Sequence, residues 1–375
     1  MENLQPKLRF PEFKEDWEET ILSNIAKIQM GQSPDSNSYN NNNLGFGLIQ
    51  GNADLIDRKI QLRQYTSNPT KLTNINDIIF TVRAPVGYVA LCDDVYCIGR
   101  GVASITAKYS KGFLFQYFIK VEERWNTLAQ GSTFTAINSK ELNNFKLNIP
   151  TLQEQTKIAD FLGAVDKQLN ILNQKKEKLT TYKKGVMQQL FSQQLRFKDD
   201  NRNDFPDWEE KTLGEVLKYT QPNKFIVKST DYNDLYNTPV LTAGKSFLLG
   251  YTNETDNIYK DIPCIIFDDF TTSSQFVDFN FKIKSSAMKI LNTIGEDNIK
   301  FLFELINTIQ FPKGDEHKRY WISEYSKLVL NIPSIAEQTK IAEFLSAIDT
   351  QIQAVENQIT KTETYKKGLL QQMFV

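Results

Sequence analysis

An internal repeat constrains the fold of this chain more than any other feature of its sequence. Residues 148–191 align without a gap on residues 331–374, and about half of the aligned positions are identical. Shorter matches precede the repeated segments in both halves, where the sequence Trp-Glu-Glu occurs at residues 17–19 and again at 208–210. The chain is therefore a tandem duplication, and each half contains a globular region of ordinary domain size followed by one long repeated segment.

The repeated segments have the periodicity of long helices. Apolar residues recur every three to four positions over about five heptads in each copy, which predicts a coiled-coil seam. Polar residues, among them Lys183 and Lys366, interrupt this seam. Because each seam needs a partner and the duplicate supplies one, we expect the two helices to pack antiparallel within the chain. The residues predicted to pack in the helix pair are Ile158, Leu162, Val165, Leu169, Leu172, Leu179, Ile341, Leu345, Ile348, Ile352, Val355 and Ile359.

Each long helix has a recognisable start. Pro150 and Pro333 are each followed by a threonine or serine and, three residues later, by a glutamate. This spacing predicts a capping box, in which the hydroxyl and the glutamate carboxylate each accept a hydrogen bond from a free N–H group of the first turn.

The globular regions combine strands with one helix each. Short runs rich in β-branched and aromatic residues, such as 77–82 and 262–267, alternate with loops rich in Gly, Asn and Ser. We predict an α+β chain with two mixed α/β domains in tandem, joined by two long helices that form an antiparallel coiled coil. The predicted boundaries are 1–147 for the first domain, 148–192 for the central helix, 193–330 for the second domain and 331–375 for the C-terminal helix.

Composition limits the possible environment of the chain. The sequence contains no run of about 18 apolar residues that could cross a membrane. The cysteines Cys92, Cys97 and Cys264 lack CxxC spacing, which favours a reducing compartment, and we expect a cytoplasmic protein. The net charge of −1 disfavours tight binding to a polyanion by the whole chain. Any affinity for DNA must come from local patches or from the charge of a partner.

The motifs of common enzymes are missing. His317 is the only histidine, which excludes a Ser-His-Asp triad or a histidine-based zinc site within one chain. The segment 243–246, Ala-Gly-Lys-Ser, resembles the end of a phosphate-binding loop, but Pro239 stands where the first glycine is needed. A glycine-rich cofactor loop for methyl transfer is also absent. We therefore expect a protein that is not an enzyme and binds neither a metal ion nor a cofactor.

The repeated blocks resemble those of a known family, the specificity (S) subunits of type I restriction-modification systems. The resemblance is carried by the pattern Ile-Pro-x-x-x-Glu-Gln-x-Lys-Ile-Ala-x-Phe-Leu-x-x-x-Asp at 149–166 and 332–349, and by the Trp-Glu-x-x-x-Leu segments that begin at Trp17 and Trp208. Gly131-Ser132-Thr133 before the first block and His317-Lys318-Arg319-Tyr320 before the second add to it.

The resemblance implies a function in DNA recognition without catalysis. Residues 1–147 and 193–330 would be target-recognition domains, each reading one half of a bipartite site in double-stranded DNA. The helices would set the spacing between the half-sites and dock two methyltransferase (M) subunits, and two restriction/translocase (R) subunits would complete the complex. S-adenosylmethionine, ATP and Mg²⁺ would act on those other subunits, and the methylated base would be adenine.

The resemblance assigns no base-contacting residue, so candidates come from side-chain chemistry alone. Arg and Lys suit guanine, Asn and Gln suit adenine, and hydroxyl groups contact any base. The DNA-binding candidates chosen on this basis are Gln32, Ser33, Asn37, Arg58, Arg63, Arg83, Ser132, Thr133, Lys245, Ser246, Thr271, Thr272, Ser273, Ser274, Lys313, His317, Lys318 and Arg319. An alternative that the heptads alone would permit is a coiled-coil scaffold whose globular domains bind protein or glycan.

Overall fold

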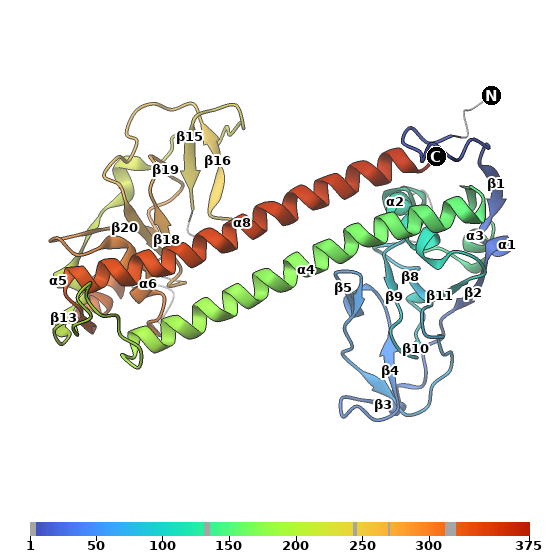
Figure 1. Ribbon diagram of the computed structural model, residues 1–375, viewed down its shortest axis with the longest axis horizontal. Helices are drawn as coiled ribbons and strands as arrows, with labels where there is room; N and C mark the ends of the chain where they lie inside the picture. Colours follow the sequence, from blue (N-terminus) through green and yellow to red (C-terminus); the bar gives the residue numbers. More distant parts are fainter. Residues whose placement is uncertain (1–4, 131–135, 243–245, 269–270, 312–319) are drawn as a thin grey trace. The chain divides into compact units, whose positions relative to one another are not determined.

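The computed structural model describes residues 5–130, 136–242, 246–268, 271–311 and 320–375. The chain divides into two compact units. Unit 1 comprises Met1–Gln174 and Glu356–Val375, and unit 2 comprises Lys175–Val355. Each unit therefore contains one globular region together with a part of both long helices, α4 (Leu152–Phe191) and α8 (Ile335–Met373), which Figure 1 shows in green and red.

Unit 1 contains a four-stranded antiparallel sheet in the order β2-β11-β8-β9 and a smaller sheet in the order β10-β4-β7-β3. The pair β1-β12 joins the start of the globular region to its end, just before α4. The bounds are β1 Glu18–Ile21, α1 Leu22–Ile25, β2 Ala26–Met30, η1 Ser36–Ser38, β3 Tyr39–Asn40, β4 Phe46–Ile49, η2 Asn52–Asp54, β5 Leu55–Ile56, β6 Lys59–Ile60, β7 Tyr65–Thr66, β8 Ile78–Thr81, β9 Val89–Leu91, β10 Cys97–Ile98, β11 Val102–Ala107, α2 Lys111–Gln130, α3 Ser139–Asn143 and β12 Lys146–Ile149.

Unit 2 repeats the topology of the main sheet, and its small sheet, as described, has one strand fewer. Its main sheet has the order β14-β20-β17-β18, its small sheet the order β16-β15-β19, and β13 pairs with β21 as β1 pairs with β12. The duplication inferred from the sequence thus extends to the strand order of the globular regions. The bounds are β13 Glu209–Thr212, α5 Leu213–Val216, β14 Leu217–Thr220, η3 Pro222–Phe225, β15 Thr238–Leu241, β16 Leu248–Thr252, β17 Cys264–Asp268, β18 Ser274–Val277, β19 Lys282–Ile283, β20 Met288–Thr293, α6 Ile299–Ile306, α7 Tyr320–Ser323, η4 Tyr325–Lys327 and β21 Val329–Ile332.

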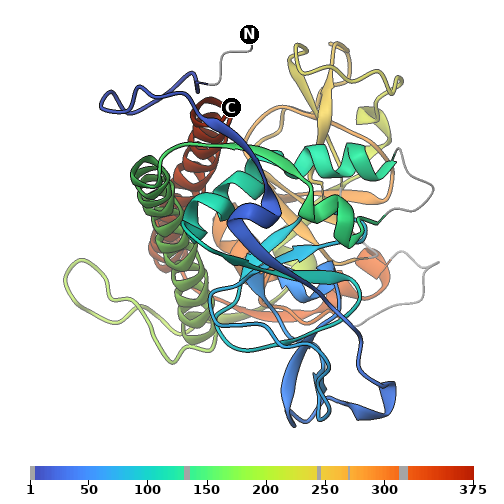
Figure 2. The same ribbon diagram turned by 90° about the vertical axis from the view of Figure 1, so that its right-hand side faces the viewer.

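The core of unit 1 includes residues from both long helices. Ile158 and Leu162 of α4 pack with Leu370 and Phe374, at the C-terminal end of the chain, around the aromatic core of the globular region. The beginning of α4 thus lies beside the end of α8, which makes the helices antiparallel within this unit, as Figures 1 and 2 also show. The ring centroids of Phe374 and Phe113 of α2 lie 5.4 Å apart.

Unit 2 is built in the same way with the helices exchanged. Val186 and Leu190 near the end of α4 pack with Ile341 and Leu345 of α8 around the core of the second globular region. The helices are again antiparallel, and the predicted antiparallel pairing is confirmed within each unit. Each repeat therefore contributes the first part of its long helix to its own unit and the end of that helix to the other unit.

The predicted capping box is half present at the start of α4, where Glu154 N donates to Thr151 Oγ1 at 3.5 Å, but the glutamates of both helices bind arginines instead of the backbone. Glu154 Oε1 and Oε2 accept hydrogen bonds of 2.8 Å from the guanidinium group of Arg9, and the Glu154 carboxylate is 1% exposed. Arg196 holds Glu337 in the same way in unit 2. The glutamates thus tie the segment before each globular region to the first turn of a long helix, because a buried carboxylate needs a cationic partner more than a backbone N–H group.

Candidate nucleic-acid interface

In unit 1 three chain segments cross at one end of the main sheet with almost no space between their backbones. A Cβ atom at Gly31 would lie 2.1 Å from the carbonyl oxygen of Gly99, and one at Gly101 would lie 2.1 Å from the carbonyl oxygen of Gln50. Both distances are too short for any side chain, so glycine is required at these two positions. Hydrogen bonds from Gly31 N to Val102 O and from Gly99 N to Ile49 O, of 2.9 and 2.8 Å, hold the segments together.

Two arginines lie at this end of the sheet, one just after β8 and the other just before β11. Strands β8 and β11 are antiparallel with Thr81 opposite Val102, and Val82 N donates to Gly101 O at 2.9 Å. Arg83 and Arg100 are the next residues outward on the two segments, and both are exposed. Within the described residues, neither guanidinium group has a hydrogen-bond or ion-pair partner.

Two predicted residues from the loop after β2 lie at the same end. Gln32 N donates to Ile98 O at 2.8 Å, and Ser33 Oγ accepts a hydrogen bond of 3.2 Å from Arg100 N. The Gln32 side chain is exposed, whereas Ser33 is half-buried and fixes the backbone of Arg100. Asn37 is exposed a few residues further on, in η1. The structure thus brings Gln32, Ser33 and Arg83 together and adds Arg100 to them.

The corresponding end of unit 2 carries hydroxyl groups. Lys284 N donates to Leu241 O at 2.9 Å, as Gly99 does to Ile49 in unit 1. The connection from there to the main sheet has one residue more than in unit 1, and the exposed Ser285 and Ser286 lie where unit 1 has Arg100. The predicted residues Thr271, Thr272 and Ser273 lie between β17 and β18 at this end, and Ser274 is the first residue of β18.

Some of these hydroxyl groups already form hydrogen bonds within unit 2. Thr271 Oγ1 donates to the buried Asp268 carboxylate at 2.8 Å, and Ser274 Oγ bonds Asn307 Oδ1 at 2.9 Å. The Thr272 hydroxyl donates to the carbonyl oxygen of Thr271 at 2.7 Å, and Ser273 is exposed. Ser246 is also exposed, in the turn between β15 and β16.

The other predicted DNA-binding residues lie elsewhere or outside the described part of the chain. Arg63 Nε donates to the buried Asp54 carboxylate at 2.8 Å. The guanidinium group of Arg58 pairs with Glu122 at 2.5 Å and lies 4.1 Å from the centre of the Tyr88 ring. Ser132, Thr133, Lys245, Lys313, His317, Lys318 and Arg319 fall outside the described residues.

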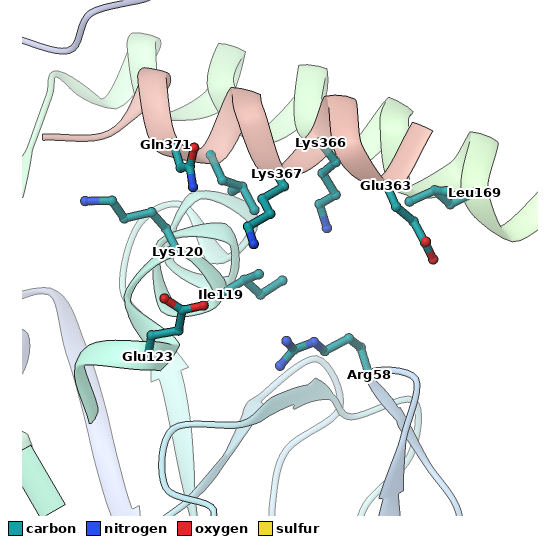
Figure 3. Close-up of a pocket in the computed structure, with 10 residues that line it drawn as sticks. Arg58, Ile119, Lys120, Glu123, Leu169, Glu363, Lys366, Lys367 and Gln371 are labelled. Atoms are coloured by element: carbon teal, nitrogen blue, oxygen red, sulfur yellow. The ribbon is translucent and has the colours of Figure 1, made fainter. Parts of the chain in front are cut away.

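Arg58 also lines a pocket of about 360 Å³ in unit 1. Figure 3 shows Arg58, from the turn between β5 and β6, below Lys366 and Lys367 of α8, with Lys120 of α2 to one side. Burial lowers the pKa of Lys120, the Arg124 charge lowers it further, and its Nζ atom lies 3.3 Å from the carbonyl oxygen of Val375. Because Arg58 and Lys366 are neutralised by carboxylates, the pocket has less free positive charge than its lining suggests.

Lys366 belongs to an ion cluster that joins three helices of unit 1. Its Nζ atom lies 2.5 Å from Asp166 Oδ1 of α4, and Gln116 Nε2 of α2 donates to Asp166 Oδ2 at 2.6 Å. Gln116 is buried, and its Oε1 atom has no hydrogen-bond partner. We call Lys366, Asp166 and Gln116 the ion cluster of unit 1.

The same positions form a more highly charged cluster in unit 2. Lys183 of α4 lies 2.7 Å from Asp349 of α8 and 2.9 Å from Glu304 of α6, and Lys300 pairs with both acids at 3.1 and 3.0 Å. These four residues are the ion cluster of unit 2. Burial raises the pKa of Asp349, but the hydrogen bond and charge of Lys183, followed by Lys300, outweigh burial and hold the pKa below its usual value.

The two ion clusters differ in one pair of positions, for a steric reason. Gly112 and Gln116 of α2 align with Lys300 and Glu304 of α6. A Cβ atom at Gly112 would lie 2.9 Å from Ala159 Cβ of α4, so no lysine fits there. With one lysine fewer, a neutral glutamine beside Asp166 keeps the cluster of unit 1 free of an uncompensated buried charge.

The structure also places the residues predicted to pack in the helix pair. Ile158, Leu162, Leu172, Ile341, Leu345, Ile348 and Val355 are buried. Val165, Leu169, Leu179, Ile352 and Ile359 are half-buried. Lys183 and Lys366, two of the residues that interrupt the heptads, belong to the ion clusters, so these two interruptions are matched by a carboxylate on the facing helix.

Known proteins place this architecture in one family. The family model described as "Type I restriction modification DNA specificity domain" matches residues 14–181 and again 206–363. The two matches cover most of the chain, one in each repeat. The chain therefore belongs to this family.

The curated relatives are specificity subunits of type I restriction enzymes. The chain is 45% identical over 174 residues to the EcoR124I/EcoR124II specificity subunit of Escherichia coli, which covers 42% of this chain and 43% of that one. It is 37% identical over 197 residues to the putative MjaX specificity subunit of Methanocaldococcus jannaschii, covering 51% and 46%. The matched part thus spans less than half the length of either relative.

Solved structures have the same fold. The S subunit of a type I restriction-modification system from M. genitalium superposes with a TM-score of 0.68, at 16% sequence identity, over 99% of both chains. At this identity the likeness concerns the fold, and it supports the two-domain, two-helix architecture predicted from the sequence.

No helix within the described residues combines the length and apolar composition needed to cross a bilayer.

Proposed function

We propose that this chain is the DNA sequence-recognition subunit of a type I restriction-modification complex. Each globular region reads one half of a bipartite target, and the chain itself carries out no catalysis. The helices set the spacing of the half-sites and dock two methyltransferase subunits, to which two restriction/translocase subunits bind in the cytoplasm. S-adenosylmethionine, ATP and Mg²⁺ act on those partners, and adenine is the methylated base.

One observation carries this proposal. Among the residues that the structure describes, the same end of the main sheet bears exposed polar side chains in both units, yet these include two arginines and a glutamine in unit 1 and are mainly hydroxyl groups beside the half-buried Lys284 in unit 2. A shared scaffold with different side chains at equivalent positions is what two readers of different sequences require, because side-chain donors and acceptors specify the base. A scaffold protein with two copies of one binding domain would have no need of this difference.

Exchange of one domain tests the proposal. Residues 1–147 are replaced by the equivalent domain of another family member, and the chain is expressed with its methyltransferase subunit in a host that lacks other adenine methylation. We expect genome-wide mapping of methylated adenines to show a new first half-site and an unchanged second half-site. Absence of site-specific methylation with the original chain, or a change in both half-sites, contradicts the proposal.

A further inference from the structure

The arginines at the sheet end of unit 1 differ from the arginines that support the fold. Arg9, Arg58, Arg63 and Arg196 each pair with a carboxylate within 2.8 Å. Arg83 and Arg100 are exposed at the ends of neighbouring segments, with no carboxylate partner within the described residues. Like charges that face each other across an antiparallel pair destabilise it. The arrangement therefore fits a ligand that supplies negative potential at this place.

Both arginines rise from backbone that is held in place. Ser33 Oγ accepts from Arg100 N at 3.2 Å, and the glycines on either side of Arg100 lie in the close crossing described above. Arg83 forms an antiparallel bridge with Ala136, and Ile137 N donates to Val82 O at 2.8 Å. A side chain that reads a base edge needs a backbone that is fixed beforehand, and both arginines meet this requirement.

We propose that Arg83 and Arg100 are specificity-determining residues that each bind a guanine in the half-site recognised by unit 1. The inference rests on the proposed function and names the base chemistry of one half-site. A guanidinium group offers two parallel N–H donors, which match the O6 and N7 acceptors of guanine in the major groove. Ser33 acts as a positioning residue, because it touches the Arg100 backbone and leaves the guanidinium group free.

The inference also predicts an asymmetry between the half-sites. At the corresponding end of unit 2, Ser285 and Ser286 lie where unit 1 has Arg100, and residues 271–274 carry hydroxyl groups. A hydroxyl group both donates and accepts, so it does not select guanine. A guanine requirement that depends on Arg83 and Arg100 therefore belongs to the first half-site alone.

The test compares the variants R83A and R100A with the original chain, each expressed with the methyltransferase subunit. The matched control is R124A, which removes an exposed arginine of α2 in the same unit. Adenine methylation is mapped genome-wide, and methylation of duplexes with single base-pair changes is then measured with the purified complexes. For each arginine variant we expect one G·C pair of one half-site to become dispensable, with discrimination at that pair falling about tenfold or more. R124A should retain the complete motif.

The outcomes separate this inference from the proposed function. If the original chain directs methylation to a bipartite motif but its arginine variants keep every position of that motif, base reading by these arginines is wrong and the function stands. Equal loss of methylation at all sites, with the motif unchanged, would assign the arginines to phosphate contacts and overturn the inference. A motif with no G·C pair in the affected half-site would overturn it as well. Relaxation at one G·C pair for each variant, in the same half-site, supports it.

Discussion

At the scale of residues, the least predictable features are the ones that depend on contacts between distant segments. Arg100 was not selected from the sequence, although Gly99 and Gly101 flank it and signal a tight backbone approach. The lysines at 183 and 366 were recognised as interruptions of the heptads, but their partners at 349 and 166 follow only from the register of the facing helices. Side-chain type could be chosen from the sequence, whereas exposure and pairing could not.

The ion clusters predict unequal effects of two equivalent mutations. K183M leaves two carboxylates facing Lys300 alone, and we expect it to lower the free energy of unfolding of unit 2 by about 2–4 kcal/mol. K366M leaves only Asp166, which keeps its hydrogen bond from Gln116. We expect this variant to lower the free energy of unfolding of unit 1 by about 1–2 kcal/mol. Hydrogen exchange of the two units measures both. If K183M and K366M lost equal amounts of unfolding free energy, Glu304 and Lys300 would not contribute to the difference between the units.

Asp349 gives the stability of unit 2 a dependence on acid. Because its pKa is lowered in the folded state, its contribution is present above its ordinary pKa of 3.8 and is lost as the pH falls through the folded value. We expect the stability difference between the original chain and D349N to stay constant from about pH 7 to 5 and to shrink below about pH 4. E343Q, at an exposed position of the same helix, serves as the control. A difference that grows on acidification would contradict the assigned sign.

At the scale of elements, the long helices were the most predictable part of the fold and the short strands the least. The helices follow from a periodicity sustained over many turns, so α4 and α8 are found close to the predicted places. The sheet β10-β4-β7-β3 contains strands of only two to four residues, too short for an alternating pattern to be visible. The exchange of helix ends between the units also has no local signal in the sequence.

That exchange predicts that a change near the C-terminus damages the first globular region. Phe374 is 4% exposed and packs against Trp17, Phe113 and Tyr117 of unit 1. We expect F374A to destabilise unit 1 by about 3 kcal/mol and to leave unit 2 unchanged. Hydrogen exchange should then speed up in β8, β11 and α2. Q372A, which alters an exposed side chain two residues earlier, is the control, and faster exchange in unit 2 instead of unit 1 would exclude this packing.

At the scale of the whole molecule, the architecture was predictable because the chain is a duplication. Two copies of one pattern imply two similar domains and two helices that can pair with each other. The function that we propose was suggested by the resemblance of the repeated blocks to a known family. The identity of the target bases was not predictable, because it depends on a few side chains in loops that differ between the repeats. The loop at 32–43, which has no counterpart visible in the sequence of the second half, illustrates this.

In the proposed function the helix pair sets the spacing of the two half-sites. Four residues inserted after Lys176 of α4 add about one helical turn and about 6 Å. We expect the unspecified spacer to lengthen by one or two base pairs, since B-DNA rises about 3.4 Å per base pair, while both half-sites stay the same. Methylated sites mapped genome-wide show the spacer directly. The control is the same insertion in the exposed turn after Asn201, and retained methylation with an unaltered spacer would refute a role of the helix in spacing.

The composition of unit 1 from two distant stretches of chain has a consequence for synthesis on the ribosome. Unit 2 is one continuous stretch, Lys175–Val355, and all of its core residues are available once that stretch has emerged. Unit 1 lacks Leu369, Leu370, Met373 and Phe374 of its core until the last helical turns are made. At a translation rate of about 5–20 residues per second, these residues are synthesised roughly 10 s or longer after the first globular region. The domain that is translated first is therefore the one that is completed last, and until then it exposes apolar surface that chaperones can bind.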